Sequence, residues 1–270
     1  MLNFYRELSP AKPYNLHGHT QFCDGRNTML EFAEAAVEAG FSHYGFSPHS
    51  PICVPSPCNM PKESVGEYLD EIYRLREKYQ EKIRIYASME IDYLGPDWGP
   101  ATDYFQHIPL DYRIGSVHFV PTQEGTPVDI DGSPERFALR LDECFRGDLR
   151  YVVEKFFEQS IMMVENGGFD IIGHLDKIAL NASHVDPEIT STGWYKSLLD
   201  ELIDKTVDQK ITVEINTKHF AKYGFFFPTP AVWPELKNRG AQIVINSDAH
   251  YTDLINASRA EAIALLADAR

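Results

Sequence analysis

The sequence predicts an α/β fold, most simply a distorted (β/α)7 TIM-like barrel with functional residues at the carboxyl ends of its strands. Short apolar runs alternate with segments of helical periodicity along all 270 residues. Strands that are separated by helices pair in parallel, because each crossover helix returns the chain to the same end of the sheet. No linker or internal repeat divides the chain, so we expect residues 1–270 to form a single domain.

Seven apolar runs have the length and composition of strands that are buried on both faces. In chain order they are Tyr14–Leu16, His43–Ser47, Ile83–Glu90, Tyr112–His118, Phe169–His174, Ile211–Asn216 and Gln242–Asn246. No Gly-x-Gly-x-x-Gly or Walker-type loop follows any of them, which disfavours an open nucleotide-binding sheet.

Helical spacing of apolar residues predicts the intervening helices. Asn27 and Thr28 are the two candidate N-caps for the first of these, and Gly40 lies just beyond its end. The expected helices are Met29–Glu38, Glu63–Tyr79, Leu149–Asn166, Trp194–Asp208, a helix that ends near Gly240, and Asp253–Ala267. Two long stretches, 50–61 and 119–147, are predicted to be irregular, and long loops of this kind are candidate lids over a site.

Composition excludes some classes of function. The formal net charge of -15 argues against a general nucleic-acid binder, whose affinity depends on Lys and Arg, but it is compatible with bound divalent cations. The four cysteines match no zinc-ribbon or redox spacing, and the N-terminus lacks the apolar core of a signal peptide. We therefore expect a cytoplasmic protein, and no apolar stretch is long enough for a membrane span.

Histidines and acids lie where the predicted strands end. Single strand-end histidines are more often structural than metal ligands, but here six of the seven predicted strands end in His, Asp or Glu. The carboxyl ends of parallel barrel strands meet at one face. With Asp24 from the first loop, the candidate metal ligands are His17, His19, Asp24, His49, Glu90, His118, His174, Asp248 and His250.

This ligand set is larger than one zinc ion needs, so we expect two or three divalent ions, with Zn, Mn and Fe as alternatives. Glu90 lies mid-chain between the histidine groups and is the candidate bridging ligand. Neighbouring ions can lower the pKa of a shared water and clamp a phosphoryl oxygen. No Gly-x-Ser-x-Gly motif suggests a covalent nucleophile.

Motifs along nearly the whole chain resemble those of the polymerase and histidinol phosphatase (PHP) family, and of its histidinol-phosphate phosphatase branch in particular. In order they are His17-Gly18-His19 with Asp24, Ser47-Pro48-His49, Met89-Glu90, Gly115-Ser116-Val117-His118-Phe119, Phe169 to Asp176, Glu214-Ile215-Asn216-Thr217 and Ser247-Asp248-Ala249-His250. Two positions depart from many relatives: Pro48 stands where an acid is common, and Asp24 where some members have histidine.

The resemblance implies a distorted seven-stranded barrel with a trinuclear metal centre. By analogy, the first ion would be held by His17, His19, Glu90 and Asp248, the second by Glu90, His118 and His174, and the third by Asp24, His49 and His250. The implied reaction, in histidine biosynthesis, is hydrolysis of L-histidinol phosphate to L-histidinol and phosphate by a metal-bound hydroxide. Asp248 is the candidate general acid for the leaving alkoxide.

The sequence indicates the residues that contact the substrate less directly than it indicates the metal ligands. Candidates at the same rim of the barrel are Asn216, Glu214, Lys177, Lys218 and Arg146. Glu214 has two alternatives: it could orient a metal ligand from below, or contact the cationic amine of the substrate. The partner expected on this basis is a small phosphorylated molecule, and the oligomeric state stays open.

Two other functions remain alternatives. A phosphoesterase or nuclease acting on nucleotides would use the same cluster, although the acidic balance and lack of a basic stripe count against it. A non-catalytic metal-binding module is the second alternative, and the complete ligand set counts against it.

Overall fold

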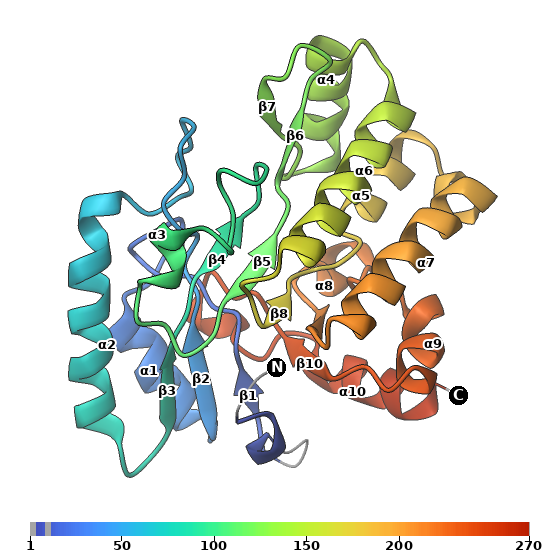
Figure 1. The fold of residues 1–270 in the computed structure, drawn as a ribbon. Coiled ribbons are helices and arrows are strands. Elements are labelled where there is room, and N and C mark those ends of the chain that lie inside the picture. The colour runs from blue at the N-terminus through green and yellow to red at the C-terminus, as the bar shows by residue number, and fades with distance from the viewer. Residues whose placement is uncertain (1–3, 9–11, 270) are drawn as a thin grey trace.

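Two parallel sheets form the centre of the molecule in this computed structural model, which describes residues 4–8 and 12–269 (Figure 1). One sheet has the order β1 (Tyr14–Asn15), β2 (His43–Phe46), β3 (Arg84–Ala87). The other has the order β10 (Ile243–Asn246), β9 (Thr212–Asn216), β8 (Ile171–Ile172), β5 (Ile114–Ser116), β4 (Glu90–Asp92). Every neighbouring pair in both sheets is parallel, as the alternation of strands and helices predicts.

Isolated parallel bridges join the two sheets at both seams. Gly18 after β1 pairs with Ala249 after β10, and His49 after β2 pairs with Glu90 at the start of β4. The third predicted strand is divided into β3 and β4 around Ser88, whose backbone hydrogen-bonds with the Tyr68 hydroxyl. Counting β3 and β4 as one interrupted strand, seven strand positions form a ring, which confirms the distorted (β/α)7 barrel.

Helices cover the outside of this ring (Figure 1). The predicted helices Met29–Glu38 and Leu149–Asn166 are observed with those bounds as α1 and α5. Thr28 caps α1 in a capping box with Glu31, as its position predicts. The other helices are α2 (Val65–Tyr79), α3 (Asp103–Gln106), α4 (Pro134–Phe145), α6 (Ile178–Val185), α7 (Gly193–Asp208), α8 (Phe220–Tyr223), α9 (Trp233–Asn238) and α10 (Arg259–Asp268).

The prediction that 119–147 is irregular is wrong. This segment forms an antiparallel hairpin of β6 (Phe119–Pro121) and β7 (Pro127–Asp129), followed by α4. Ser133 caps α4 and Pro134 occupies its first turn, which is a start signal present in the sequence. The hairpin and α4 project beyond the strand ends at the top of Figure 1. By contrast, 50–61 contains no helix or strand, as predicted.

The last helix also begins later than predicted. Residues Thr252–Leu254 form a 3-10 turn, and α10 starts at Arg259 after Ser258 adopts a left-handed backbone with φ 52°. None of the described helices is both long and apolar enough to cross a membrane. The assignment of residues 1–270 to one domain stays a prediction.

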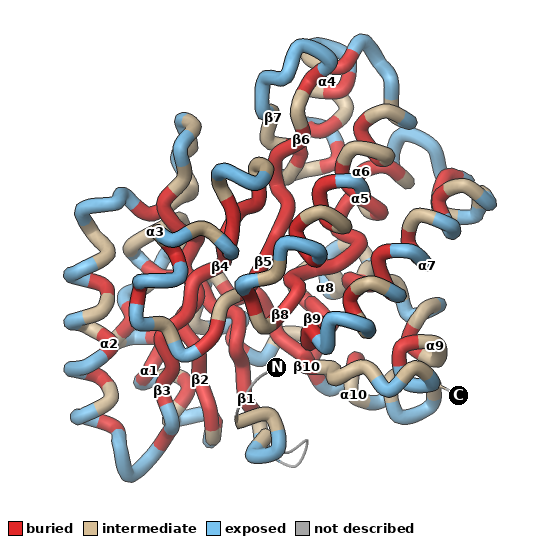
Figure 2. Tube along the Cα trace, in the orientation of Figure 1, coloured by how far each residue is buried: buried red, intermediate tan, exposed pale blue. Residues whose placement is uncertain are grey.

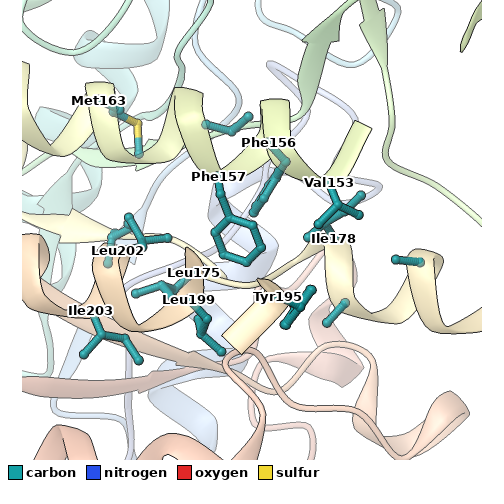
Figure 3. Close-up of a cluster of buried hydrophobic side chains, with 14 of the residues drawn as sticks. Val153, Phe156, Phe157, Met163, Leu175, Ile178, Tyr195, Leu199, Leu202 and Ile203 are labelled. Atoms are coloured by element: carbon teal, nitrogen blue, oxygen red, sulfur yellow. The ribbon is translucent and has the colours of Figure 1, made fainter. Parts of the chain in front are cut away.

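The largest apolar core lies between the barrel and its helical cover. Figure 2 shows the central strands buried along their length, while the outer helices alternate between buried and exposed turns. In Figure 3, Phe157 of α5 points toward Leu199 and Leu202 of α7. Buried apolar contact of this extent is the main favourable term in folding, and here it supports the strands that carry the polar face of the barrel.

Candidate metal centre

The structure brings all nine predicted metal ligands together at the carboxyl ends of the barrel strands. His17 and His19 follow β1, and His118 follows β5. Short distances between neighbouring side chains connect the whole set, and all nine are buried except Asp24 and His250, which are partly exposed. The parallel arrangement explains this convergence, because every strand end that carries a ligand lies at the same face.

Glu90 occupies the middle of the cluster, and its two oxygens face different histidines. Oε2 lies 3.3 Å from His17 Nε2 and 3.1 Å from His49 Nδ1. Oε1 lies 2.7 Å from His174 Nε2 and 3.5 Å from His118 Nε2, and it accepts a hydrogen bond of 2.7 Å from Ser116 Oγ. This division of contacts between two oxygens fits the expectation that Glu90 bridges two ions.

Four overlapping groups of side chains have donor atoms close enough to share an ion. Within the described residues they are His17/His19/Asp248, Glu90/His118/His174, His19/Asp24/His49/His250 and His49/Asp92/His118. The second group is the set expected for the second ion, and the first and third resemble the other two expected sets. Asp92 in the fourth group was not predicted.

Several buried atoms of the cluster make no hydrogen bond of good geometry within the described part of the chain, although each lies within 4 Å of a carboxylate oxygen or an imidazole nitrogen. They are His17 Nε2, His19 Nε2, Asp24 Oδ1 and His49 Nδ1. Buried polar atoms without partners are costly, and they are rare in folded proteins. Divalent cations would satisfy all four, and a mixed set of imidazole and carboxylate donors suits Zn, Mn or Fe. The residues therefore fit the metal ions that the sequence predicts.

Glu214 lies below the cluster and is fully buried. Oε1 is 2.7 Å from His17 Nδ1 and accepts from Asn246 Nδ2 at 2.9 Å. Oε2 accepts from the backbone N–H of His174 at 2.9 Å and from Asn216 Nδ2 at 3.1 Å. With both oxygens engaged and no exposed surface, Glu214 fits the predicted orienting role and not the alternative contact with a substrate amine.

Asn216, also predicted to contact substrate, is buried in the same network. Its side-chain amide donates to Asp248 Oδ2 at 3.1 Å as well as to Glu214, and its oxygen accepts from the backbone N–H of Lys218. In this geometry the side chain of Asn216 supports Asp248 and Glu214, and its role as a substrate contact stays a prediction.

Two residues of the cluster have left-handed backbone conformations. His174 has φ 26° and Asp248 has φ 49°. Such conformations are unfavourable for residues other than glycine and concentrate at functional sites. Glu214 holds the His174 backbone, while Asn216 holds the Asp248 side chain, so the orienting residues also stabilise this strained rim.

The surroundings raise the pKa of one histidine of the cluster, His118, and lower the pKa of another, His174. Burial acts to lower the pKa of His118, but the carboxylates of Asp92 and Glu90 outweigh it and raise the pKa to about 9. Burial, together with the positive charge of Lys177, lowers the pKa of His174 to about 4, which keeps that imidazole in the neutral form that binds metals.

The carboxylates of the centre are held in their charged form. Burial acts to raise the pKa of Asp248, but Lys218, His17 and the neighbouring His19 lower it well below its usual range. A carboxylate that stays ionised is a good metal ligand and a poor proton donor. The prediction that Asp248 is the general acid therefore conflicts with its surroundings, whereas its predicted role as a ligand does not.

A cavity of about 430 Å³ opens beside the cluster. Asp24, His49, His118 and His250 line its inner edge. Both predicted lid segments contribute to its walls, with Asn59 from 50–61 and Asp131 from 119–147 among the lining residues. The cavity therefore places a small ligand directly against the candidate metal ligands.

The three predicted substrate cations have different surroundings. Lys218 lines the cavity, with Nζ 3.2 Å from Asp248 Oδ1. Lys177 is buried and forms an ion pair of 3.0 Å with Asp131, which neutralises much of its charge. Arg146 directly follows α4, is 74% exposed and pairs with Glu124. Arg146 is not among the residues that line the cavity, so the structure does not bring it to the site.

Two acids of the site were missed by sequence reasoning. Asp92 lies two residues after Glu90 in β4, so the alternation of a strand places both side chains on one face, and this signal was available. Asp131 lies in the segment that was predicted to be irregular, and its contact with Lys177 joins the residues after β7 to the start of α6. No periodicity in the sequence indicates that contact.

The fold is an α/β barrel, and the histidines and carboxylates at its strand ends form a cluster whose donor atoms fit divalent cations. A family model described as the PHP domain matches residues 15–218, and the chain belongs to this family. Membership confirms the resemblance that the motifs indicate.

Curated relatives cover most of the chain. A protein of Deinococcus radiodurans named probable histidinol-phosphatase is 27% identical over 261 residues, spanning 93% of this chain and 92% of its own length. A protein of Schizosaccharomyces pombe with the same name is 26% identical over 258 residues, spanning 88% of this chain and 80% of its own.

A solved structure has a similar fold. The histidinol phosphate phosphatase of Lactococcus lactis, in complex with zinc, L-histidinol and phosphate, superposes with a TM-score of 0.73 at 20% identity. The match covers 96% of this chain and 94% of the other. At this level of identity the likeness supports the fold.

Proposed function

We propose that this protein is a metal-dependent phosphomonoesterase that hydrolyses L-histidinol phosphate to L-histidinol and phosphate. The observation that carries the proposal is the convergence of nine His, Asp and Glu side chains beside a cavity of about 430 Å³. The names of the curated relatives and the ligands of the Lactococcus lactis structure support this choice of substrate within the PHP family.

The nine ligand residues would hold two or three divalent ions, and Zn, Mn and Fe are the candidates. The zinc in the Lactococcus lactis structure favours zinc among them. Bound ions would supply an acidified water and would neutralise the charge on phosphoryl oxygens. Glu90 would act as the bridging ligand, since each of its oxygens faces a different set of histidines.

Lys218 is the best-placed residue of this chain for contacting the phosphate. Its ammonium lies 3.2 Å from Asp248 Oδ1 and 3.4 Å from His250 Nε2, at the edge where the cavity meets the cluster. A phosphate oxygen could replace one of these contacts and gain a charge-assisted hydrogen bond. The buried Lys177 is less available for such a contact, because Asp131 already pairs with it.

Phosphate release from L-histidinol phosphate tests the proposal, measured after loading the protein with Zn, Mn or Fe in turn. A dinucleotide and a simple aryl phosphate serve as comparison substrates, and we expect kcat/KM to be highest for L-histidinol phosphate. Faster hydrolysis of the dinucleotide would favour the nucleotide alternative. No phosphatase activity with any metal or monoester would favour a non-catalytic module. A cytoplasmic location stays a prediction.

Variants locate the activity at the cluster. Glu90→Gln keeps the size of the central side chain and removes its charge, so we expect hydrolysis to fall at least about 100-fold, as for the loss of a central electrostatic group. Arg146→Ala is the matched control, because Arg146 is exposed and is not among the residues that line the cavity. Equal activity of Glu90→Gln and the control would contradict the proposal.

A further inference from the structure

His118 has a buried hydrogen-bond partner that none of the predicted ligand sets includes. Asp92 Oδ1 lies 2.7 Å from His118 Nδ1, and both side chains are almost fully buried. The backbone explains the contact, because Asp92 pairs with Ser116 in the parallel register of β4 and β5. His118 lies two residues beyond Ser116, on the same face and at the end of the same strand.

The opposite nitrogen of His118 points into the cluster. His118 Nε2 lies 3.5 Å from Glu90 Oε1 and 3.2 Å from His174 Nε2. A histidine has two ring nitrogens, and a hydrogen bond at one of them determines which nitrogen is free to bind a cation. In the neutral tautomer whose Nδ1–H donates to Asp92, the lone pair of Nε2 is directed toward Glu90 and His174.

The second oxygen of Asp92 is held by the irregular segment 50–61. Asn59 Nδ2 donates to Asp92 Oδ2 at 3.1 Å and to the backbone oxygen of Ser50 at 2.8 Å. Asn59 therefore connects Asp92 to the start of this segment, whose own residues line the cavity. Hydrogen bonds therefore connect Asn59 in the segment 50–61 to Asp92, and Asp92 to His118.

We propose that Asp92 is a positioning residue for the metal centre, and that Asn59 positions Asp92 in turn. The carboxylate sets the tautomer and ring orientation of His118, so that Nε2 joins Glu90 and His174 around one ion. This inference rests on the metal centre of the proposed function. Partners of this kind typically contribute 10- to 100-fold to metal affinity.

A direct metal-binding role for Asp92 fits the contacts less well. Asp92 is close enough to His49 and His118 to form a ligand group with them. Both of its oxygens are engaged, however, one by His118 and the other by Asn59. Ligation would require breaking one of these buried hydrogen bonds and would turn His118 away from Glu90, so positioning is the role that keeps every contact.

Metal titration of the full chain tests this role without relying on any substrate. Zinc is removed and then titrated back by calorimetry into the wild type, Asp92→Ala, Asp92→Asn and Asn59→Ala, and Co(II) absorption spectra report the ligand geometry. We expect Asp92→Ala to weaken one class of sites about 10- to 100-fold. Asp92→Asn should have a smaller effect, because an amide oxygen still accepts from Nδ1, and Asn59→Ala should act in the same direction.

Asp129→Asn is the matched control. Asp129 lines the same cavity but pairs with Arg140 and belongs to none of the ligand groups. Its variant should bind zinc like the wild type, and circular dichroism checks that each variant is folded. The two milder variants, Asp92→Asn and Asn59→Ala, keep the test decisive if Asp92→Ala is unfolded.

The outcomes separate this inference from the proposed function. Unchanged zinc affinity and Co(II) spectra in the Asp92 variants would overturn the positioning role, even if L-histidinol phosphate is hydrolysed. A raised KM with normal zinc affinity would overturn it too, and would make Asp92 a substrate contact. If the wild type binds zinc but does not hydrolyse the substrate, only the proposed function fails. If zinc does not bind, the same titration is made with Mn and Fe, and a wild type that binds none of the three ions would contradict both.

Discussion

Replacing Glu214 should damage the centre from below without removing any metal ligand. Glu214 is fully buried and accepts four hydrogen bonds, from His17, His174, Asn216 and Asn246. Glu214→Ala removes all four acceptor contacts at once and leaves their donors in a place that water reaches poorly.

The structure gives a magnitude for this loss. Each buried donor that loses its partner costs about 1–3 kcal/mol, so four donors correspond to a loss of at least about 4 kcal/mol. That is a large part of the roughly 5–15 kcal/mol by which folded domains are stable. Glu214→Gln keeps the shape but replaces one acceptor oxygen with an amide donor. We expect this milder variant to fold and to bind zinc roughly 10- to 100-fold more weakly, because His17 loses its anionic partner.

Urea unfolding of the metal-free protein measures the free energy of unfolding, and calorimetric zinc titration measures the affinity. Thr206→Val is the control for loss of a buried hydrogen bond away from the centre, since Thr206 donates to Leu202 within α7. The control should lose some stability and keep its zinc affinity. A loss below about 1 kcal/mol in Glu214→Ala, together with wild-type zinc affinity in Glu214→Gln, would refute the reasoning.

Three further predictions concern charge and metal. Lys218→Met should raise the KM for L-histidinol phosphate roughly 10-fold or more through loss of a charge-assisted contact, with Arg146→Ala unchanged in the same steady-state assay. Removing metal with a chelator should lower the melting temperature, measured by calorimetry, by roughly 10 °C. A free metal concentration of 1,000 times Kd adds about 4 kcal/mol to the free energy of unfolding, and no shift would mean that the cluster binds no metal. In the metal-free protein, His118 has a pKa near 9, above its unfolded value, so its stabilising contribution is present below pH 6.5 and is lost as the pH rises through 9. As the pH rises through this range, the urea midpoint of Asp92→Asn should fall less than that of the wild type. An equal fall in both proteins would contradict the claim that Asp92 raises the pKa of His118.

The predictable part of the site follows from the geometry of parallel strands. A strand that ends in His17-Gly18-His19 presents both imidazoles on one side, and a barrel collects its strand ends at one face. The cluster could therefore be predicted from strand boundaries alone. The same alternation places Asp92 beside Glu90, and only the focus on strand-terminal residues left it out.

The parts that the sequence did not reveal depend on contacts between distant segments. The hairpin and α4 lie in a segment whose short apolar runs are interrupted by Pro121 and Pro127, which hides the strands of the hairpin. The pairing of Lys177 with Asp131 forms only when the residues after β7 lie beside the start of α6. Arg146 follows α4 and is exposed, and no local pattern indicates that it lies outside the cavity lining.

An anomalous-scattering map of crystals soaked with a phosphate analogue tests the central claim most directly. Data collected at the Zn, Mn and Fe absorption edges would give the number and identity of the ions. We expect two or three peaks among His17, His49, Glu90 and His174, with the anion between them and Lys218. Strong peaks elsewhere, or a cluster without any peak in metal-loaded crystals, would contradict the account.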